Sequence, residues 1–283
     1  MRRSLASRAQ RAVGLMPVYL LVVPVVLLML LPYVIMVRTA LTPHDQLYVY
    51  PLRVLPTWWR LANFVDTWII SRFDASLRNS LVVSVGSTVL ALLVAIPGAY
   101  ALARFRFRFR RAFLYLILVT QMFSPILIIV GLFKTISTLG VINTYWALII
   151  TYAAFGLAFT IWMLTGFFRS IPQELEEAAW IDGCTRMGAL RQVIAPLALP
   201  GIVTAMIFLF ISAWNEFLIA VTFIFDDRLK TLPPLVVGLS GTRYQTEWEQ
   251  VMAASLMATL PVVILFVFLE RHLVRSLTAG AVK

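Results

Sequence analysis

The sequence predicts an all-α membrane protein with six transmembrane helices. Hydrophobic residues make up 61% of the chain and charged residues only 13%, whereas a usual soluble domain has roughly half and a quarter. Several uncharged runs exceed the roughly 20 residues that a helix needs to cross about 30 Å of hydrocarbon. Helices satisfy their own backbone hydrogen bonds in lipid, so these runs predict membrane-spanning helices.

The first four spans follow from the positions of these uncharged runs. The first run follows four arginines and is too long for a signal-peptide core, so we interpret it as an uncleaved anchor. The uncharged stretch 135–168 is too long for one ordinary helix, and Gly140 and Asn143 predict a turn before Tyr145. The first four expected spans are 15–37, 80–103, 112–133 and 145–168.

The fifth and sixth spans are expected at residues 201–225 and 251–269. Glu216 is the only charged residue in the fifth. One transmembrane domain therefore covers residues 15–272, between a cytoplasmic N-terminal segment and a C-terminal tail. Those two flanking segments are residues 1–14 and 273–283.

The distribution of Lys and Arg predicts that both termini are cytoplasmic. Four basic residues precede the first span, five lie between spans two and three, three between spans four and five, and three follow the sixth. These make up most of the 24 basic residues, and cytoplasmic loops carry the excess of Lys and Arg in membrane proteins. We therefore expect a plasma-membrane protein that crosses the membrane several times.

Catalytic, metal and cofactor chemistry is not expected of this chain. Cys184 is its only cysteine, and two separated histidines do not make a usual metal site with it. None of the three lysines follows a glycine, so the chain has no G-x-x-x-x-G-K-[ST] loop for nucleotide phosphates. No nucleophile, base and acid converge in the sequence. We therefore expect no bound cofactor and no enzymatic activity.

An arginine-rich run at residues 104–111 alternates with phenylalanine. On a soluble protein this interleaving would indicate nucleic-acid binding. Here the run lies between two predicted spans, where basic side chains meet the negative surface of the membrane. It predicts contact with anionic membrane lipid and no nucleic-acid partner.

The loop between spans four and five, residues 170–196, predicts two short helices. Ser170 and Gln173 have the spacing of a capping box, and three glutamates follow in the first turn, where the helix dipole favours negative charge. Gly183 is a natural stop, and Thr185 a natural cap for a second helix that would end at Pro196. On this second helix, an apolar face is expected from Met187, Leu190 and Ile194.

Such a helix-turn-helix outside the membrane has two interpretations. It docks on a partner protein with its apolar face, or it lies on its own bundle or on lipid headgroups. Its small residues Ala178 and Ala179 would allow a partner surface to come close. Physical reasoning alone leaves both interpretations open.

The same residues resemble the EAA loop of ABC importer permeases, written E-A-A, three residues, G, nine residues, I-x-L-P. The spacing is intact here, with Val193 in place of Ile and Ala195 in place of Leu. The resemblance implies a cytoplasmic coupling helix-turn-helix that seats in an ATPase subunit. The coupling residues that it implies are Glu177, Ala178, Ala179, Asp182, Gly183, Met187 and Pro196.

Three further stretches resemble the carbohydrate branch of that family, which is similar to the second permease subunit of the maltose importer. They are residues 99–107, the motif Trp-Asn-Glu-Phe at 214–217, and the tail 277–283. Phe109 stands where that branch often has glycine, and the glycine that often follows the last lysine is absent.

The resemblance implies that the chain forms half of the translocation path for a sugar, with a disaccharide such as trehalose or maltose as the best candidate. Implied partners are a second permease subunit in a heterodimer, two ATP-binding subunits that use ATP and Mg, and an extracytoplasmic sugar-binding protein or lipoprotein. The tail would contact the ATPase through Thr278, Gly280 and Lys283, although a frayed terminus is the alternative.

Trp214, Asn215 and Glu216 are candidates for lining the translocation path. A charge inside a span is costly, so Glu216 is expected to face the bundle or a wet cavity. The alternative is a packing or subunit-interface role, with hydrogen bonds between helices. As an alternative function, a secondary transporter would show interrupted helices in paired halves and several coupling charges, whereas here one acidic residue stands alone.

Overall fold

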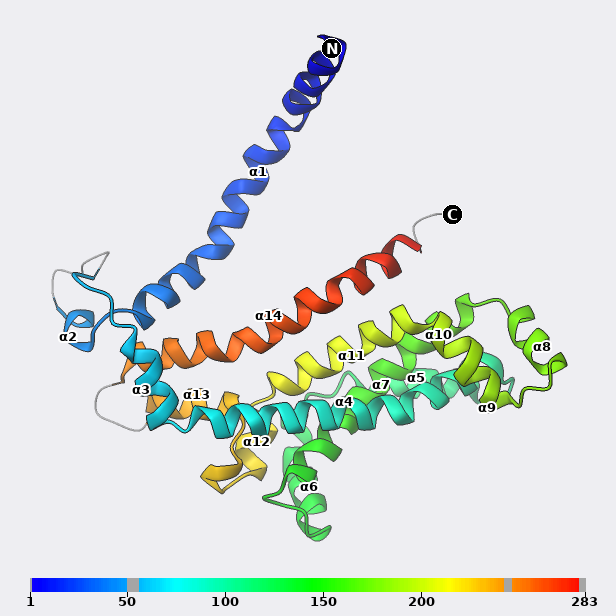
Figure 1. Ribbon diagram of the computed structural model, residues 1–283. Coiled ribbons are helices and arrows are strands. Elements are labelled where there is room, and N and C mark those ends of the chain that lie inside the picture. The colour runs from blue at the N-terminus through cyan, green and yellow to red at the C-terminus, as the bar shows by residue number, and fades with distance from the viewer. Residues whose placement is uncertain (1, 50–55, 242–245, 280–283) are drawn as a thin grey trace. The chain divides into compact units, whose positions relative to one another are not determined.

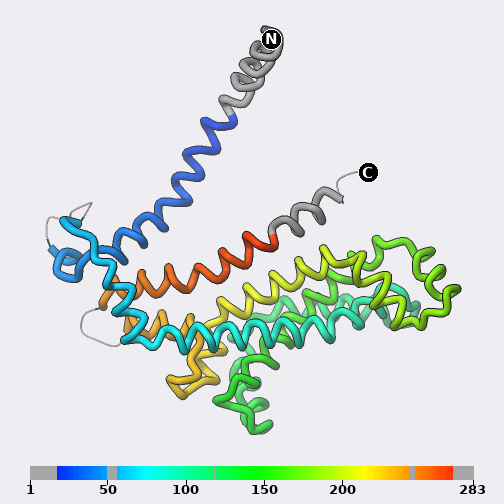
Figure 2. The backbone as a smooth tube through the Cα atoms, viewed as in Figure 1, coloured from blue at the N-terminus to red at the C-terminus, as the bar shows by residue number. Residues whose placement is uncertain are grey.

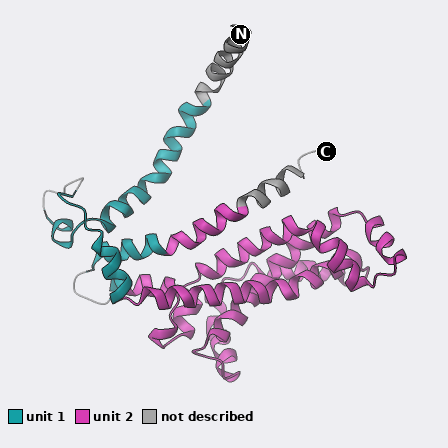
Figure 3. Cartoon of the chain, in the orientation of Figure 1, with its two compact units in different colours: residues 1–70, 239–257 teal, residues 71–238, 258–283 magenta. Residues whose placement is uncertain are grey.

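The computed structural model describes residues 2–49, 56–241 and 246–279, and all regular elements within these ranges are helical, as Figure 1 shows. This confirms the predicted all-α class. The chain forms two compact units, coloured separately in Figure 3. Unit 1 consists of Met1–Ile70 and Leu239–Met257, and unit 2 consists of Ser71–Gly238 and Ala258–Lys283.

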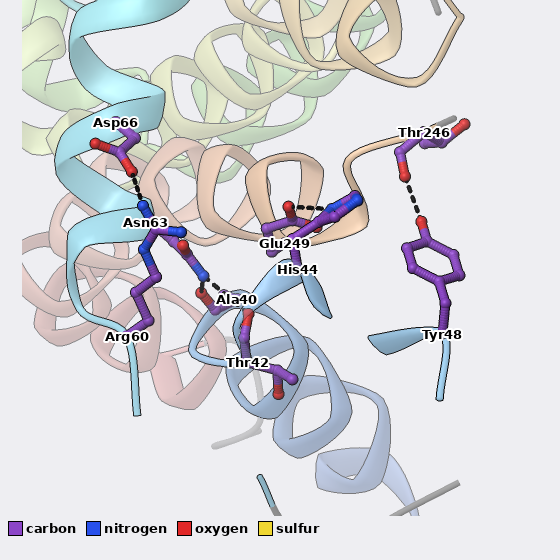
Figure 4. A network of polar contacts seen from close by, with 9 residues as sticks. All are labelled: Ala40, Thr42, His44, Tyr48, Arg60, Asn63, Asp66, Thr246 and Glu249. Atoms are coloured by element: carbon purple, nitrogen blue, oxygen red, sulfur yellow. Dashed lines mark hydrogen bonds and ion pairs between the residues drawn. The ribbon is translucent and has the colours of Figure 1, made fainter. Parts of the chain in front are cut away.

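Unit 1 contains α1 (Arg2–Ala40), α2 (His44–Leu47), α3 (Ala62–Ile70) and the first turns of α14 (Trp248–Ala279). A buried asparagine joins α1 to α3, as the close-up in Figure 4 shows. The Asn63 amide donates to the Ala40 carbonyl at 2.9 Å and to the Thr42 carbonyl at 3.0 Å. Both carbonyls lie at or just beyond the end of α1, where helix carbonyls lack intrahelical partners.

Further polar contacts hold α2 and the segments around it within unit 1 (Figure 4). The His44 Nδ1 lies 2.8 Å from Oε1 of the buried Glu249, at the start of α14. The Tyr48 hydroxyl donates to the Thr246 carbonyl. Unit 1 is therefore tied together by side chains that reach across about 200 residues of sequence.

Unit 2 is a bundle of helices, and the backbone tube in Figure 2 shows the course of the chain through it. Its long helices are α4 (Phe73–Arg104), α7 (Tyr145–Ser170) and α11 (Leu199–Trp214). The shorter elements are α5 (Arg110–Thr120), α6 (Pro125–Thr138), α8 (Glu174–Ile181), α9 (Arg186–Ala189), a π-helical turn (Leu190–Ile194), α10 (Ala195–Leu197), α12 (Leu218–Phe223) and a 3-10 turn (Asp227–Leu229). Helix α13 (Leu232–Gly241) follows and ends in unit 1.

Small residues allow α4, α7 and α11 to pack closely. Ala91, Ala95 and Ala99 on α4 are completely buried. A Cβ atom on Gly156 would lie 2.2 Å from the Leu209 side chain, so α7 and α11 approach each other through this glycine. Membrane helices commonly pack through small residues in this way, because lipid supplies no hydrophobic driving force between them.

Among the residues that the structure describes, four helical segments are long and apolar enough to span a membrane: Val18–Ala40, Phe73–Arg104, Tyr145–Ser170 and Trp248–Leu269. A fifth crossing would be a bent pair, Arg186–Leu197 with Leu199–Trp214, whose axes differ by 80°. These segments fall at four of the six expected spans, with wider bounds at most ends. The count of six spans stays a prediction.

The expected third span, 112–133, is wrong as one continuous helix. Residues 121–124 separate α5 from α6, and Pro125 begins α6. The backbone of Ser124 is extended, with ψ of 136°, because the proline ring disfavours the helical conformation in the residue before it. Pro125 had no assigned role in the sequence, and the structure gives it this one.

The expected fifth span, 201–225, is also interrupted. Helix α11 ends at Trp214 and α12 begins at Leu218, so residues 215–217 are not helical. This break places Glu216 at the start of a new helix. Its carboxylate meets the free amides there, which a continuous helix would not offer.

Candidate functional site

The two short helices expected between residues 170 and 196 are present as α8 and α9, and the turn between them depends on Gly183. Its φ of +86° lies in the left-handed region that favours glycine. The Gly183 amide donates to the Trp180 carbonyl at 3.0 Å, and the Cys184 amide to the Ala179 carbonyl at 2.9 Å. These bonds satisfy carbonyls at the end of α8, as in a glycine-terminated helix. We call residues 171–198 the elbow.

The start of the second elbow helix is also as predicted, whereas the start of the first is not. The Thr185 hydroxyl accepts the Gly188 amide at 3.1 Å and caps α9. The predicted capping box of Ser170 and Gln173 is wrong. Helix α7 continues through Ser170, whose hydroxyl donates to the Phe167 carbonyl, and Gln173 makes no side-chain cap to α8.

The helical path of the second elbow helix ends at Leu197, one residue beyond the end predicted at Pro196. A π-helical turn at Leu190–Ile194 precedes the proline. Proline lacks an amide hydrogen and its ring crowds the preceding turn, and a wider turn relieves that crowding. The chain bends after α10, and the 80° change of direction leads into α11.

A buried ion pair joins the elbow to the end of α4. Arg104 pairs with Glu176 of α8, and their side chains are only 7% and 2% exposed. A second Arg104 nitrogen donates to the Ile171 carbonyl at 2.9 Å. A charge held out of water needs such partners, and removing one would leave the other uncompensated. Glu176 therefore fixes α8 on α4 and does more than complement the helix dipole.

An arginine between two aromatic rings adds a second link across the same joint. The Arg186 guanidinium lies 5.0 Å from the ring centre of Phe105, just after α4, and 5.3 Å from that of Trp180 on α8. Both distances are within the range of cation–π attraction. A small pocket of about 120 Å³ lies at this joint, between Arg104, Glu176 and these three side chains.

The elbow presents apolar side chains that no other part of the described residues covers. Ile181 is 87% exposed, Met187 49% and Leu175 43%. Ala178 is exposed as well, whereas Ala179 is buried against the chain itself. These exposed apolar side chains are available for contact with a partner. The remaining predicted coupling residues Glu177, Asp182, Gly183 and Pro196 are also exposed.

The three candidate path residues lie at the break between α11 and α12, in different environments. Trp214 is buried, stacks on Phe210 and donates from its indole nitrogen to the Ala258 carbonyl at 3.2 Å. The Glu216 carboxylate accepts the amides of Ile219 at 2.9 Å and Ala220 at 3.1 Å.

The Tyr152 hydroxyl of α7 also donates to the Glu216 carboxylate, at 2.7 Å. Glu216 thus caps α12 and links it to α7, which is the interhelical hydrogen-bonding role that the sequence left as an alternative. Of the three candidate path residues, only Asn215 is exposed.

At the other end of α4, three polar residues that the sequence did not single out for function fix the segment after α12. The Asn79 amide donates to the carbonyls of Arg228 and Lys230 at 2.8 and 3.0 Å, and its oxygen accepts the Tyr145 hydroxyl at 2.7 Å. Asn143 has a φ of +58° and accepts two amides, from Phe225 and Asp226. The sequence indicated only a turn before Tyr145 in this region, and it did not indicate these hydrogen bonds.

Two of the three predicted tail residues, Gly280 and Lys283, lie outside the described residues. Thr278 falls within α14, in a part of the helix for which only the backbone is described. The tail contact with an ATPase therefore stays a prediction.

Comparison with known proteins identifies the class to which this helical bundle belongs. The model of the family "Binding-protein-dependent transport system inner membrane component" matches residues 87–279, from the middle of α4 to the end of α14. The chain belongs to this family of inner membrane transport components. This membership favours an ABC importer permease over the alternative of a secondary transporter. Interrupted helices, which secondary transporters also have, are present here as well.

The chain is similar to several permeases of defined systems. It is 37% identical over 254 residues to the sulfoquinovosyl glycerol transport system permease SmoH of Agrobacterium fabrum, which covers 90% of this chain and 89% of the relative. It is 36% identical over 211 residues to the trehalose/maltose transport system permease MalG of Thermococcus litoralis, with 75% and 76% covered.

A solved structure shares the fold across almost the whole chain. It is the crystal structure of a bacterial ABC transporter involved in the import of the acidic polysaccharide alginate. The TM-score is 0.78 at 25% sequence identity, and the match covers 93% of this chain and 97% of the other. The chain is thus a permease of the ABC importer type, and such permeases leave ATP hydrolysis to separate subunits.

Proposed function

We propose that the chain forms half of the translocation path of a sugar importer and that its elbow docks on an ATP-binding subunit. The observation that carries this proposal is the exposed apolar surface of α8 and α9, held on α4 by the buried pair of Arg104 and Glu176. An exposed apolar surface is suited to binding a partner. The buried ion pair allows a movement of that surface to be transmitted to the long helix α4.

The names of the relatives support a carbohydrate as the substrate. The two permeases reported above serve sulfoquinovosyl glycerol and trehalose or maltose, and the solved transporter imports alginate. These solutes share sugar rings and differ in size and charge. Trehalose and maltose are the first disaccharides to test.

The proposed assembly contains a second permease subunit, two ATP-binding subunits that use ATP and Mg, and an extracytoplasmic sugar-binding protein. Both termini and the elbow lie on the cytoplasmic side, in agreement with the basic residues near the chain ends and at residues 104–111. Of the candidate path residues, Asn215 has the exposed side chain, so we place solute contact there and assign Trp214 and Glu216 to packing.

The test uses the complete importer in liposomes, with ATP hydrolysis stimulated by binding protein loaded with trehalose or maltose. Ile181→Asp combined with Met187→Asp places two charges on the docking surface. Both side chains are exposed, so folding should be retained while stimulated hydrolysis falls at least about tenfold, because burying unpaired charge opposes docking.

Phe109→Asp is the matched control, since Phe109 is 69% exposed and lies just before α5, outside the elbow. It should leave stimulation unchanged. Wild-type coupling in the elbow variant would contradict the docking role. Stimulation by neither disaccharide in the wild-type importer would contradict this substrate choice but leave the elbow variant testable with another sugar-loaded binding protein.

A further inference from the structure

A groove of about 930 Å³ lies between α5 and α7, at the end of unit 2 that carries the elbow. Three arginines line it: Arg110 and Arg111 at the start of α5, and Arg169 near the end of α7. Tyr115 and Trp162 line it as well, so one groove combines positive charge with broad apolar surface. Neither the elbow nor the candidate path uses these residues.

The positive charge of the groove has no counter-charge in the described chain. In the residues that the structure describes, no acidic side chain forms an ion pair with Arg110, Arg111 or Arg169. Arg110 donates from one nitrogen to the Ala103 carbonyl at 3.2 Å, and its buried Nε has no hydrogen-bond partner. An anion in the groove would supply the missing counter-charge to these arginines.

The arginines also act on one another. Burial lowers the pKa of the Arg110 guanidinium, and the positive charges of Arg169, Arg106 and Arg111 lower it further. These positive charges repel one another, and a bound anion would offset that repulsion because it attracts each arginine. The local electrostatics therefore favour a negatively charged ligand.

The apolar part of the groove indicates a ligand with a hydrophobic tail. Tyr115 is 67% exposed and Trp162 47%, although both carry large aromatic surfaces. Trp162 lies two turns before the end of the apolar helical segment Tyr145–Ser170, whose last residues are Arg169 and Ser170. Positive charge lies at the end of this helix, and aromatic surface lies further from that end. This order matches a phospholipid, whose phosphate lies at the membrane surface and whose acyl chains lie in the hydrocarbon.

The arginine-rich run before α5 therefore divides into separate roles. Arg104 forms an ion pair with Glu176, whereas Arg106 and Arg108 are exposed and do not line the groove. Only Arg110 and Arg111 enter the groove, where they join Arg169 from another helix. We propose that this groove is a binding site for one anionic phospholipid, with its phosphate on the three arginines and an acyl chain along Tyr115 and Trp162.

The test measures lipid binding to the purified importer complex by native mass spectrometry. Phosphatidylglycerol and phosphatidylcholine with the same acyl chains are the two probes. Wild-type complex should retain phosphatidylglycerol in preference. Arg110→Ala with Arg169→Ala should weaken that retention by roughly thirtyfold, from two lost charges near the membrane surface. Arg106→Ala with Arg108→Ala removes the same charge outside the groove and should change it less than about twofold.

A second pair of variants tests the groove without changing any charge. A Cβ atom on Gly166 would meet open space in the groove, and Gly166→Leu fills that space. Gly131 on α6 also faces open space but does not line the groove, so Gly131→Leu is the matched control. Both leucines favour the helix over glycine, so both variants should fold. Only Gly166→Leu should weaken phosphatidylglycerol binding.

Three outcomes would overturn the proposal. Equal losses in the two double-arginine variants would reduce the effect to general charge attraction. Displacement of phosphatidylglycerol by millimolar inorganic phosphate would show that the arginines bind a free anion without an acyl chain. Retention by the isolated chain but not by the complex would show that the partner permease covers the groove. Arg110→Lys with Arg169→Lys keeps the charge and should keep most binding, which separates charge from misfolding.

Discussion

The two ends of α4 are held by different chemistry. At its C-terminal end, Arg104 forms a buried ion pair with Glu176 of the elbow. At its N-terminal end, Asn79 uses a neutral amide to bind two backbone carbonyls and the Tyr145 hydroxyl. Both residues reach segments distant in sequence, yet one contact is ionic and the other is entirely neutral.

The difference suggests different tasks for the two ends. The neutral amide of Asn79 is completely buried and uses both donor and acceptor, which makes a closed clamp. The elbow end instead holds two buried charges, and the same elbow carries the exposed Ile181 and Met187. A buried ion pair is weak evidence for stability, and its best-supported use is to specify one arrangement. We infer that the Asn79 end is a frame and the elbow end a joint with a defined angle.

Glu176→Gln should be the most damaging change at either end. It leaves Arg104 buried beside a neutral amide, and breaking a buried pair by removing one partner costs about 3–5 kcal/mol. We expect a loss of that order in the free energy of unfolding in detergent, and loss of stimulated ATP hydrolysis. Glu177→Gln changes the exposed neighbour and should be neutral in stability. Equal stability of the two variants would show that the joint does not depend on this pair.

Asn79→Ala should have the next largest effect. It leaves the Tyr145 hydroxyl and the carbonyls of Arg228 and Lys230 without this partner, and unsatisfied buried groups cost about 1–3 kcal/mol each before relaxation. We expect a loss of about 2–3 kcal/mol in the free energy of unfolding, with the coupling ratio between transport and hydrolysis retained. The exposed Arg78→Ala is the control. Uncoupled hydrolysis in Asn79→Ala would remove the distinction between frame and joint.

The sequence predicted those features of the elbow that depend on neighbouring residues. Gly183 and Thr185 act within a few residues of their own positions, and both behave as their residue types indicate. Ser170 also has a local cap signal, but the preceding helix continues through it and uses its hydroxyl. Local signals therefore predicted where a helix turns better than where the previous helix ends.

The features that depend on distant residues were not predictable in the same way. Arg104 lies in an arginine-rich run that indicates lipid contact, and nothing in its surroundings shows that Glu176 is its partner. The breaks inside the third and fifth expected spans also escaped hydropathy, which measures apolar content and not helix continuity. Pro125 marked one break, but proline is common in membrane helices and gave no unique signal.

Glu216→Gln tests whether the frame extends to the break between α11 and α12, and it should cost less stability than Asn79→Ala. Glutamine keeps one acceptor oxygen, but its amide nitrogen cannot accept from the amides of Ile219 and Ala220 or from Tyr152. We expect a loss of about 1 kcal/mol in the free energy of unfolding. The KM for sugar uptake should stay unchanged, because the Glu216 carboxylate already accepts hydrogen bonds from the chain's own groups and so does not bind the solute.

Asn215→Ala is the counterpart, since Asn215 is adjacent but exposed. It should leave stability unchanged, because the loss of an exposed side chain away from buried networks costs little. If Asn215 contacts the solute, the KM for uptake should rise in this variant alone. A raised KM in Glu216→Gln with unchanged stability would reverse the assignment, placing the acidic residue in the path and leaving the capping bonds without energetic consequence.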